Sequence, residues 1–170
     1  MGPDTTLLLK AVDAVQDADD LDAVVLSLAA ELGSRFDLWY LCLCSLRTGG
    51  ESVTILASWS VADTVLTAGA EVATSITPAV ATMLDQLGES QPVHTRIGAN
   101  PDSLVDHLMT EQGVREATLQ PVHSDEHGML FLVLGSGSDG VLPATPRSFF
   151  AGLAAGIRPR LLELTHLAHG

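Results

Sequence analysis

The two cysteines of the chain, Cys42 and Cys44, stand two positions apart in an apolar run. On a strand, side chains at this spacing point to the same face, and each thiol could be oxidised singly as a redox sensor. A disulfide between them would require the chain to bend. Reactive thiols need exposure and nearby positive charge, whereas the neighbours here are Tyr40, Leu41 and Leu43. The sequence therefore favours packed core thiols over a redox pair.

Two further motifs are better explained as loops than as binding sites. The sequence from Gly135 to Gly140, GSGSDG, matches the G-x-G-x-x-G pattern of dinucleotide-binding proteins. Two prolines follow closely, so no helix can begin there to receive a pyrophosphate, and a surface loop is favoured. The residues from His123 to His127 place two imidazoles and two carboxylates at a hairpin tip. A tight turn rarely aims enough ligands inward to hold zinc, so we expect a solvated turn and no metal.

Composition excludes several classes of protein. The 170 residues are 46% hydrophobic, too apolar for a disordered chain, and 21 acidic against 8 basic residues give a net charge of −13. Such a charge repels nucleic-acid phosphates and anionic lipids, so neither is expected as a direct partner. The chain lacks both the roughly 20-residue apolar run of a membrane span and the features of a signal peptide. Two thiols without a disulfide framework fit a reducing cytoplasm, which is the expected location.

Recurring residue pairs mark the boundaries of helices. A capping Thr or Asn before proline predicts helix starts at 77–78, 100–101 and 145–146, and glycine predicts helix ends at Gly33, Gly88 and Gly113. Apolar residues at helical spacing predict helices over 7–15, 21–32, 80–87, 104–109 and 147–164. We expect Pro159 to kink the last helix near Ala155, because proline removes one backbone hydrogen bond.

Strand-like runs lie between the helices, over residues 36–46, 52–60, 71–76, 92–97, 115–124 and 128–135. The first run is apolar on both of its alternating faces, which is typical of a central strand covered on both sides. The last two runs flank a short loop and predict a hairpin. Hairpins joined by helical segments indicate an α+β domain with a mostly antiparallel sheet.

Three passages of sequence resemble the GAF domain, the small-molecule sensor module of many signalling proteins. Residues 21–46 resemble its opening helix and first strand, and FFAGLAAGI at 149–157 resembles its closing helix. GVREATLQPV at 113–122 and GMLFLVLG at 128–135 resemble its closing hairpin. The resemblance implies a six-stranded antiparallel sheet with the first and last helices on one face. It implies a ligand pocket on the other face, under the loops and middle helices.

The resemblance also indicates which residues border the pocket. His94 and His107 fall in regions that border it, and Tyr40 and Trp59 could line the same cavity or merely fill core. Such histidines can ligate haem or hydrogen-bond a ligand, although no partner ligand is evident and a half-buried or surface histidine is the favoured alternative. The chain lacks an aspartate that many members carry after the position of Pro92, a cyclic-nucleotide motif and a bilin-attachment cysteine. Nothing in the sequence therefore selects haem, a nucleotide or any other ligand.

The terminal helices are expected to pair two copies of the chain. Their apolar stripes extend beyond what one small sheet needs to cover, and the resemblance implies dimerisation through them. Packing on the chain's own sheet is the alternative. The predicted organisation is an N-terminal helix over 1–18 and one GAF-like domain over 19–170. The residues expected at the dimer interface are Leu8, Val12, Val15, Leu153, Ile157, Leu161 and Leu164.

The expected function is that of a non-enzymatic regulatory domain in a signal-transduction or transcription-regulatory protein. It would bind a small ligand and pass the change to the terminal helices. One alternative is a dimerisation module without a ligand. A second is a thiol-dependent reductase of the free methionine sulfoxide reductase type, although its cysteines sit further along the fold than Cys42 and Cys44.

Overall fold

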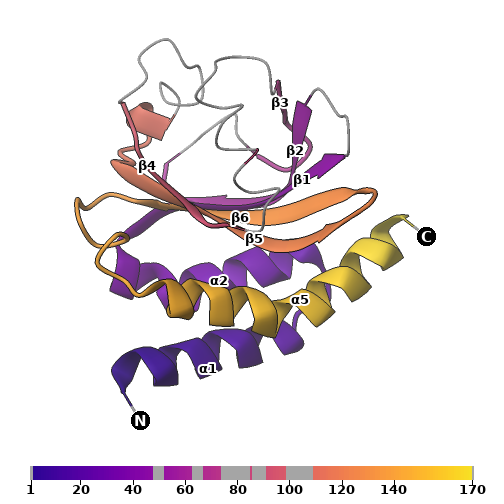
Figure 1. The fold of residues 1–170 in the computed structure, drawn as a ribbon, viewed down its shortest axis with the longest axis horizontal. Helices are drawn as coiled ribbons and strands as arrows, with labels where there is room; N and C mark the ends of the chain where they lie inside the picture. Colours follow the sequence, from indigo (N-terminus) through magenta and orange to yellow (C-terminus); the bar gives the residue numbers. More distant parts are fainter. Residues whose placement is uncertain are drawn as a thin grey trace.

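A computed structural model of the chain describes residues 2–47, 52–62, 67–73, 85, 91–98 and 109–169, with side chains up to residue 165. In this part of the chain, two long helices pack on one face of a six-stranded antiparallel sheet, and a third long helix packs on those two (Figure 1). The helices are α1 (Pro3–Gln16), α2 (Leu21–Phe36) and α5 (Arg147–His169). None of the helices in these ranges combines the length and the apolarity that crossing a lipid bilayer demands.

The sheet has the strand order β3-β2-β1-β6-β5-β4. This order places β1 and β6 at its centre and β3 and β4 at its edges, and the predicted α+β architecture is confirmed. The helices predicted over 80–87 and 104–109, and the end expected at Gly88, lie almost wholly outside the described residues. The strands are β1 (Leu38–Arg47), β2 (Ser52–Ser60), β3 (Glu71–Ala73), β4 (Val93–Arg96), β5 (Glu116–Asp125) and β6 (Gly128–Ser136).

Alternate residues of the strands point to opposite sides of the sheet. On β1, Leu41 and Leu43 belong to the core cluster that includes the helices. Tyr40, Cys42 and Cys44 belong to a second buried cluster on the other side. We call these two sides the helix face and the far face. The predicted burial of this strand on both sides is confirmed.

The end of α2 differs from the prediction. The helix passes through Gly33 and ends only after Phe36, where Asp37 adopts a left-handed conformation with φ 49°. The reason is packing: the ring of Phe36 lies 5.4 Å from that of Phe149 and 5.6 Å from that of Phe150. Burying an aromatic side chain outweighs the small helix penalty of a glycine. Strand β1 consequently begins at Leu38, two residues later than predicted.

The terminal helices pack against each other within one chain. All seven residues predicted at the dimer interface are buried or partly buried in the core cluster of this single copy, because the apolar stripe of α1 faces α2 and α5, and that of α5 faces α1 and the sheet. The residues concerned are Leu8, Val12, Val15, Leu153, Ile157, Leu161 and Leu164.

Two contacts bring α1 and α5 close together. A Cβ atom on Gly156 would stand 2.6 Å from Cγ2 of Val12, so the glycine permits the close approach. Beyond Pro159, which lies inside α5, the guanidinium of Arg160 donates through Nε and Nη2 to the carbonyl oxygen of Ala18, at 3.0 and 2.6 Å. Figure 1 shows α5 changing direction along its length, as expected from the internal proline.

Replacing Gly156 with alanine is expected to lower the free energy of unfolding by about 1–3 kcal/mol, because the added methyl group overpacks the contact with Val12. The matched control is Gly33→Ala in α2, where no atom lies within 4 Å of the added Cβ. This control should gain about 0.5–1 kcal/mol, since alanine favours a helix interior. Urea unfolding followed by circular dichroism measures both changes. Equal stability of the two variants would contradict the close packing.

Candidate ligand-binding site

Three groups capable of chemistry stand in a row on the far face of the central strand β1. Tyr40 is fully buried, and Cys42 and Cys44 are 2% and 4% exposed. The two Sγ atoms are 3.4 Å apart, closer than the sequence suggested, next to an irregularity in the β1–β2 pairing between Leu43 and Cys44. The thiols are packed in the core, as the sequence favoured.

Tyr40 and Cys44 are both neutral at physiological pH. Burial raises the pKa of Tyr40 far above its ordinary value of 10.0, and the neighbouring Cys42 raises it further. A hydrogen bond with Cys42 raises the pKa of the Cys44 thiol well above 9.0, and burial adds to this effect. A neutral thiol is a poor nucleophile. Tyr40 and Cys44 can therefore offer weak hydrogen bonds and polarizable sulphur, and Cys44 does not supply a thiolate.

The other buried residues of the far-face cluster are apolar. Phe131 and Val133 of β6 lie opposite Cys44 and Cys42 in the register. Ala117 of β5 joins the same cluster of buried residues. Ligand sites in proteins are mostly apolar with a few placed polar groups, which is the composition found here. The other buried members of the cluster are Val53, Ile55, Val93, Met109, Val114 and Met129.

The structure does not place Tyr40, Trp59 and His94 on one side of the sheet. Trp59 pairs with Leu41 in the register and packs against the helix-face cluster. His94 pairs with Thr118, which is opposite Leu134 of that same cluster. The cause is the two-residue period of a strand, which places these two side chains on the side opposite Tyr40. The fourth predicted residue, His107, lies outside the described residues.

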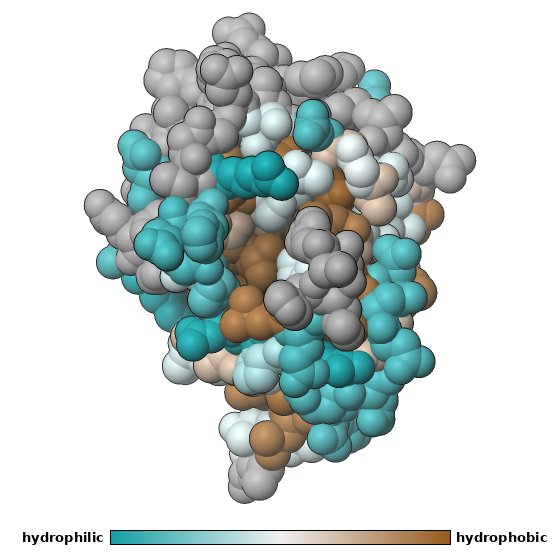
Figure 2. Space-filling view, turned by 90° about the vertical axis from the view of Figure 1, so that its right-hand side faces the viewer, coloured by the Kyte–Doolittle hydropathy of each residue, from teal (hydrophilic) through white to brown (hydrophobic). Residues whose placement is uncertain are grey.

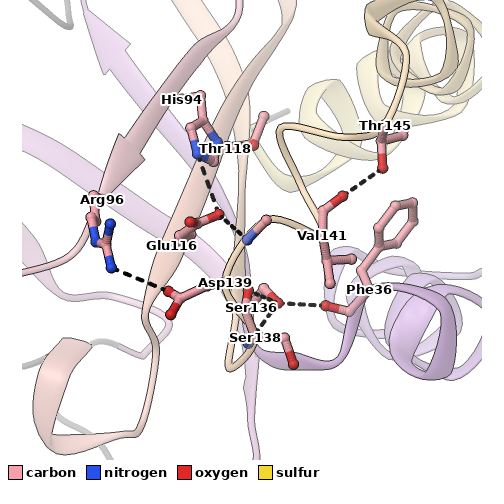
Figure 3. Close-up of polar contacts among 11 residues, drawn as sticks. Phe36, His94, Arg96, Glu116, Thr118, Ser136, Ser138, Asp139, Val141 and Thr145 are labelled. Atoms are coloured by element: carbon pink, nitrogen blue, oxygen red, sulfur yellow. Dashed lines mark hydrogen bonds and ion pairs between the residues drawn. The ribbon is translucent and has the colours of Figure 1, made fainter.

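His94 instead belongs to a polar cluster at the edge of the helix face (Figure 3). Its Nδ1 is 3.2 Å from the hydroxyl of Thr118, and its Nε2 is 3.5 Å from a carboxylate oxygen of Glu116. The same oxygen accepts a 3.2 Å hydrogen bond from the backbone N–H of Gly140. The Glu116 side chain is only 9% exposed. This carboxylate thus fastens the loop before α5 to the outer strands.

A second part of this cluster is ionic. Asp139 lies 3.8 Å from the guanidinium of Arg96 and 3.4 Å from that of Arg115. Sequence reasoning missed both Glu116 and Asp139 as structural residues. The available signal was the acidic residue at the start of an otherwise apolar strand, which indicates a buried carboxylate with partners.

The glycine-rich segment after β6 does not form a phosphate cradle. The N–H groups that would bind a phosphate are already used: Gly137 donates to the carbonyl of Asp37, and Ser138 donates to the hydroxyl of Ser136. The N–H of Gly140 is held by the Glu116 carboxylate described above. The prediction of a loop in place of a dinucleotide site is therefore supported by the hydrogen bonds.

Trp39 is a second residue that sequence reasoning missed. Its indole lies against Gly113 and Gly137, and a Cβ atom on Gly137 would collide with its Nε1. Gly113, with φ 87°, follows a helical turn over residues 109–111, as the sequence predicted. The two glycines therefore make room for one large side chain at the end of the sheet.

No group of three or more His, Cys, Asp or Glu side chains that could hold a metal ion occurs in the described ranges. At the predicted hairpin tip, His123 pairs with Asp125 at 3.1 Å, and His127 lies 3.6 Å from Glu126. The side chains of this turn satisfy one another in pairs and do not converge on one point.

Solved structures of low sequence identity share this architecture. The GAF domain of an Acinetobacter phosphoenolpyruvate-protein phosphotransferase matches with a TM-score of 0.67 at 11% identity, over 100% of this chain and 99% of that chain. The phycoerythrobilin-bound GAF domain from a cyanobacterial phytochrome matches with a TM-score of 0.60 at 14% identity, over 96% and 98%. The chain has a GAF-domain fold.

A free methionine-R-sulfoxide reductase from Neisseria meningitidis, solved in complex with its substrate, is also similar to this GAF-type domain. Its TM-score is 0.64 at 16% identity, over 96% of this chain and 91% of that chain. No family model matches the sequence, and no curated protein matches it either. Proteins with one fold carry different activities, so the function of this GAF-type domain is argued from its own residues.

Tyr40 is expected to stay protonated in the folded chain above pH 11, whereas the unfolded chain titrates near pH 10. It is the single tyrosine of the sequence, so ultraviolet absorbance of the phenolate reports on it alone. Because the raised pKa values of Cys44 and Tyr40 favour the neutral folded state, stability should be full below about pH 8 and fall as pH rises through the unfolded pKa values of about 8.5 and 10, by up to about 1.4 kcal/mol per pH unit for each group. Tyr40→Phe should reduce this fall. A native midpoint near 10 would contradict the burial.

Glu116→Ala is expected to destabilise the domain by about 1–3 kcal/mol, because the N–H of Gly140 loses its acceptor. The control is Glu126→Ala in the hairpin turn, where the side chain is 86% exposed. That change should alter stability by no more than about 0.5 kcal/mol. Urea unfolding compares the two, and an equally small effect of both would show that Glu116 does not hold the loop.

Proposed function

We propose that this chain is a sensory GAF-type domain that binds a small, mostly apolar ligand on the far face of its sheet. The observation that carries the proposal is the row of Tyr40, Cys42 and Cys44 on β1, within an otherwise apolar buried cluster. The opposite face is covered by α2 and α5, so the far face is the side on which a ligand would bind. The protein would act in cytoplasmic signal transduction or transcription regulation.

Similar structures support the choice of a ligand-binding role. The phytochrome GAF domain is described as phycoerythrobilin-bound, and the Neisseria reductase as being in complex with its substrate. These ligands belong to those proteins. For this chain they support the general proposal that a domain of this architecture accommodates a small molecule.

The proposed signal passes through the central strands. On β6, Val133 belongs to the far-face cluster, and its neighbours Leu132 and Leu134 belong to the helix-face cluster. A ligand that shifts β6 would therefore change the packing beneath α2 and α5. We describe this as a population shift, in which the ligand binds one helix packing better than the other.

We also propose a homodimer through the helix layer, in which the contact surface is the outer side of the helices and not the inner stripes predicted from the sequence. The inner stripes of α1 and α5 are occupied within one chain, so self-association would use the outer sides of the helices. Leu9 of α1 and Leu26 of α2 are 54% and 56% exposed there.

We further propose that the domain is not an enzyme. A thiol-dependent reductase needs a reactive thiolate, whereas Cys42 and Cys44 are buried and the pKa of Cys44 is raised. The reductase alternative predicts reduction of free methionine sulfoxide by the purified protein, with loss of turnover in the Cys42→Ser/Cys44→Ser double variant. Absence of turnover in the unmodified chain is the expected result.

The test is a thermal-shift screen against metabolites, tetrapyrroles and nucleotides, because a ligand that binds the native state must raise the melting temperature. Hits are then titrated while the methyl signals of Val133 and Leu132 are followed by NMR. These two residues are adjacent but face opposite sides of the sheet. A far-face ligand should therefore change the chemical shifts of the Val133 methyl groups more than those of Leu132. A screen without hits would favour the alternative of an interaction module that needs no ligand.

A further inference from the structure

A groove of about 870 Å³ lies at the end of the sheet where the β5–β6 hairpin meets the C-terminal part of α5. Figure 2 faces this end of the molecule and shows hydrophobic surface in a hollow bordered by hydrophilic side chains. The volume is within the range of small-molecule sites. We call it the hairpin groove. Its walls include Arg47, His123, Asp125, Leu130, Leu162 and Thr165.

The strand register explains why the sheet is open here. Arg47, Gly128 and Asp125 form one row across β1, β6 and β5. Gly128 stands two residues before Leu130 on β6, and Leu130 is a helix-face residue. Since residues two apart on a strand point to the same side, this row lies on the helix face. Gly128, the middle residue of the row, has no side chain, so a gap separates the side chain of Arg47 from that of Asp125. A Cβ atom at Gly128 would collide with the backbone carbonyl of Leu46, which prevents other residues from filling the gap.

The aspartate at one side of this gap is a fixed anion. Its Oδ1 accepts hydrogen bonds from the backbone N–H groups of His127, at 2.8 Å, and Gly128, at 3.2 Å. Its Oδ2 is 3.1 Å from Nε2 of His123. The N–H of His127, followed by His123, lowers the pKa of Asp125. The carboxylate is 45% exposed, so it can accept a further partner from the groove.

The arginine at the other side is an uncommitted cation. Arg47 makes no ion pair within the parts of the chain that the structure describes. The strands that carry Arg47 and Asp125 are separated by two strand spacings of about 4.8 Å each. The groove thus presents a positive and a negative group on either side of a glycine, and neither neutralises the other.

The inner part of the groove is apolar. Leu130 is buried beneath the row of charges, and Leu162 of α5 packs partly buried against the same cluster. The hydroxyl of Thr165 donates to the carbonyl of Leu161, which removes it as a free polar group. An occupant of this groove would therefore meet charge at the rim and aliphatic surface inside.

We propose that the hairpin groove binds a free α-amino acid with an aliphatic side chain. The carboxylate would pair with Arg47 and the ammonium group with Asp125, while the side chain lies on Leu130 and Leu162. A simple carboxylic acid would meet the aspartate with like charge, and a simple amine would meet the arginine in the same way. Charge complementarity thus selects a zwitterion over either single ion.

The test uses isotope-labelled chain and free L-leucine, followed by NMR signals of Gly128 and Leu162. Binding of leucine should saturate. Three analogues each lack one group: N-acetyl-leucine lacks the cation, isoamylamine lacks the anion, and glycine lacks the side chain. Each analogue should bind about fivefold more weakly than leucine, or worse. Equal shifts with leucine and its three analogues would overturn the proposal, and so would a leucine titration that shows no saturation.

Two variants locate the site. Arg47→Gln and Asp125→Asn should each weaken leucine binding about fivefold or more, and the asparagine oxygen can still accept the two backbone N–H groups of the turn. Arg158→Gln, at an exposed position of α5, is the matched control and should bind like the unmodified chain. Unchanged affinity in both groove variants, or an equal loss in the control, would overturn the assignment. The far-face proposal is tested separately, because Val133 does not line this groove.

Discussion

The burial of β1 and β6 on both sides of the sheet is the constraint on which the other features depend. Leu43 and Leu132 face each other on the helix face, and Cys44 and Phe131 face each other one residue along, on the far face. Since successive side chains point to opposite sides, a slip of one residue would exchange the two buried sets. The register therefore fixes which residues meet the helices and which lie on the far face.

The helix layer is joined to this sheet at one corner. Phe36 ends α2 in contact with two phenylalanines at the start of α5, and its carbonyl accepts a 2.7 Å hydrogen bond from the Ser136 hydroxyl at the end of β6. The loop that follows β6 is held in turn by Glu116. One corner thus connects the end of α2, the start of α5 and the outer strands, which is consistent with a domain whose sheet and helices move together.

The sequence allowed the strands to be predicted well because alternation and turn residues are local signals. Residues 52–60 were predicted as a strand with the bounds that the structure has. The helix end predicted at Gly33 was wrong, because the free-energy cost of a glycine within a helix is smaller than the gain from packing Phe36 against distant residues. Trp59 and His94 were misplaced because residue type alone does not indicate which face a side chain occupies. That depends on strand register, which forms only when distant segments pair.

The double hydrogen bond from Arg160 to the carbonyl of Ala18 has a mechanical consequence. It clamps the turn between α1 and α2 to α5 just beyond its proline, while Gly156 holds α1 against the preceding turn. The two terminal helices are therefore fastened to each other at two successive turns of α5, on either side of its proline. Neither fastening involves a residue of the sheet, so the pairing of the two helices does not depend on their contacts with the strands.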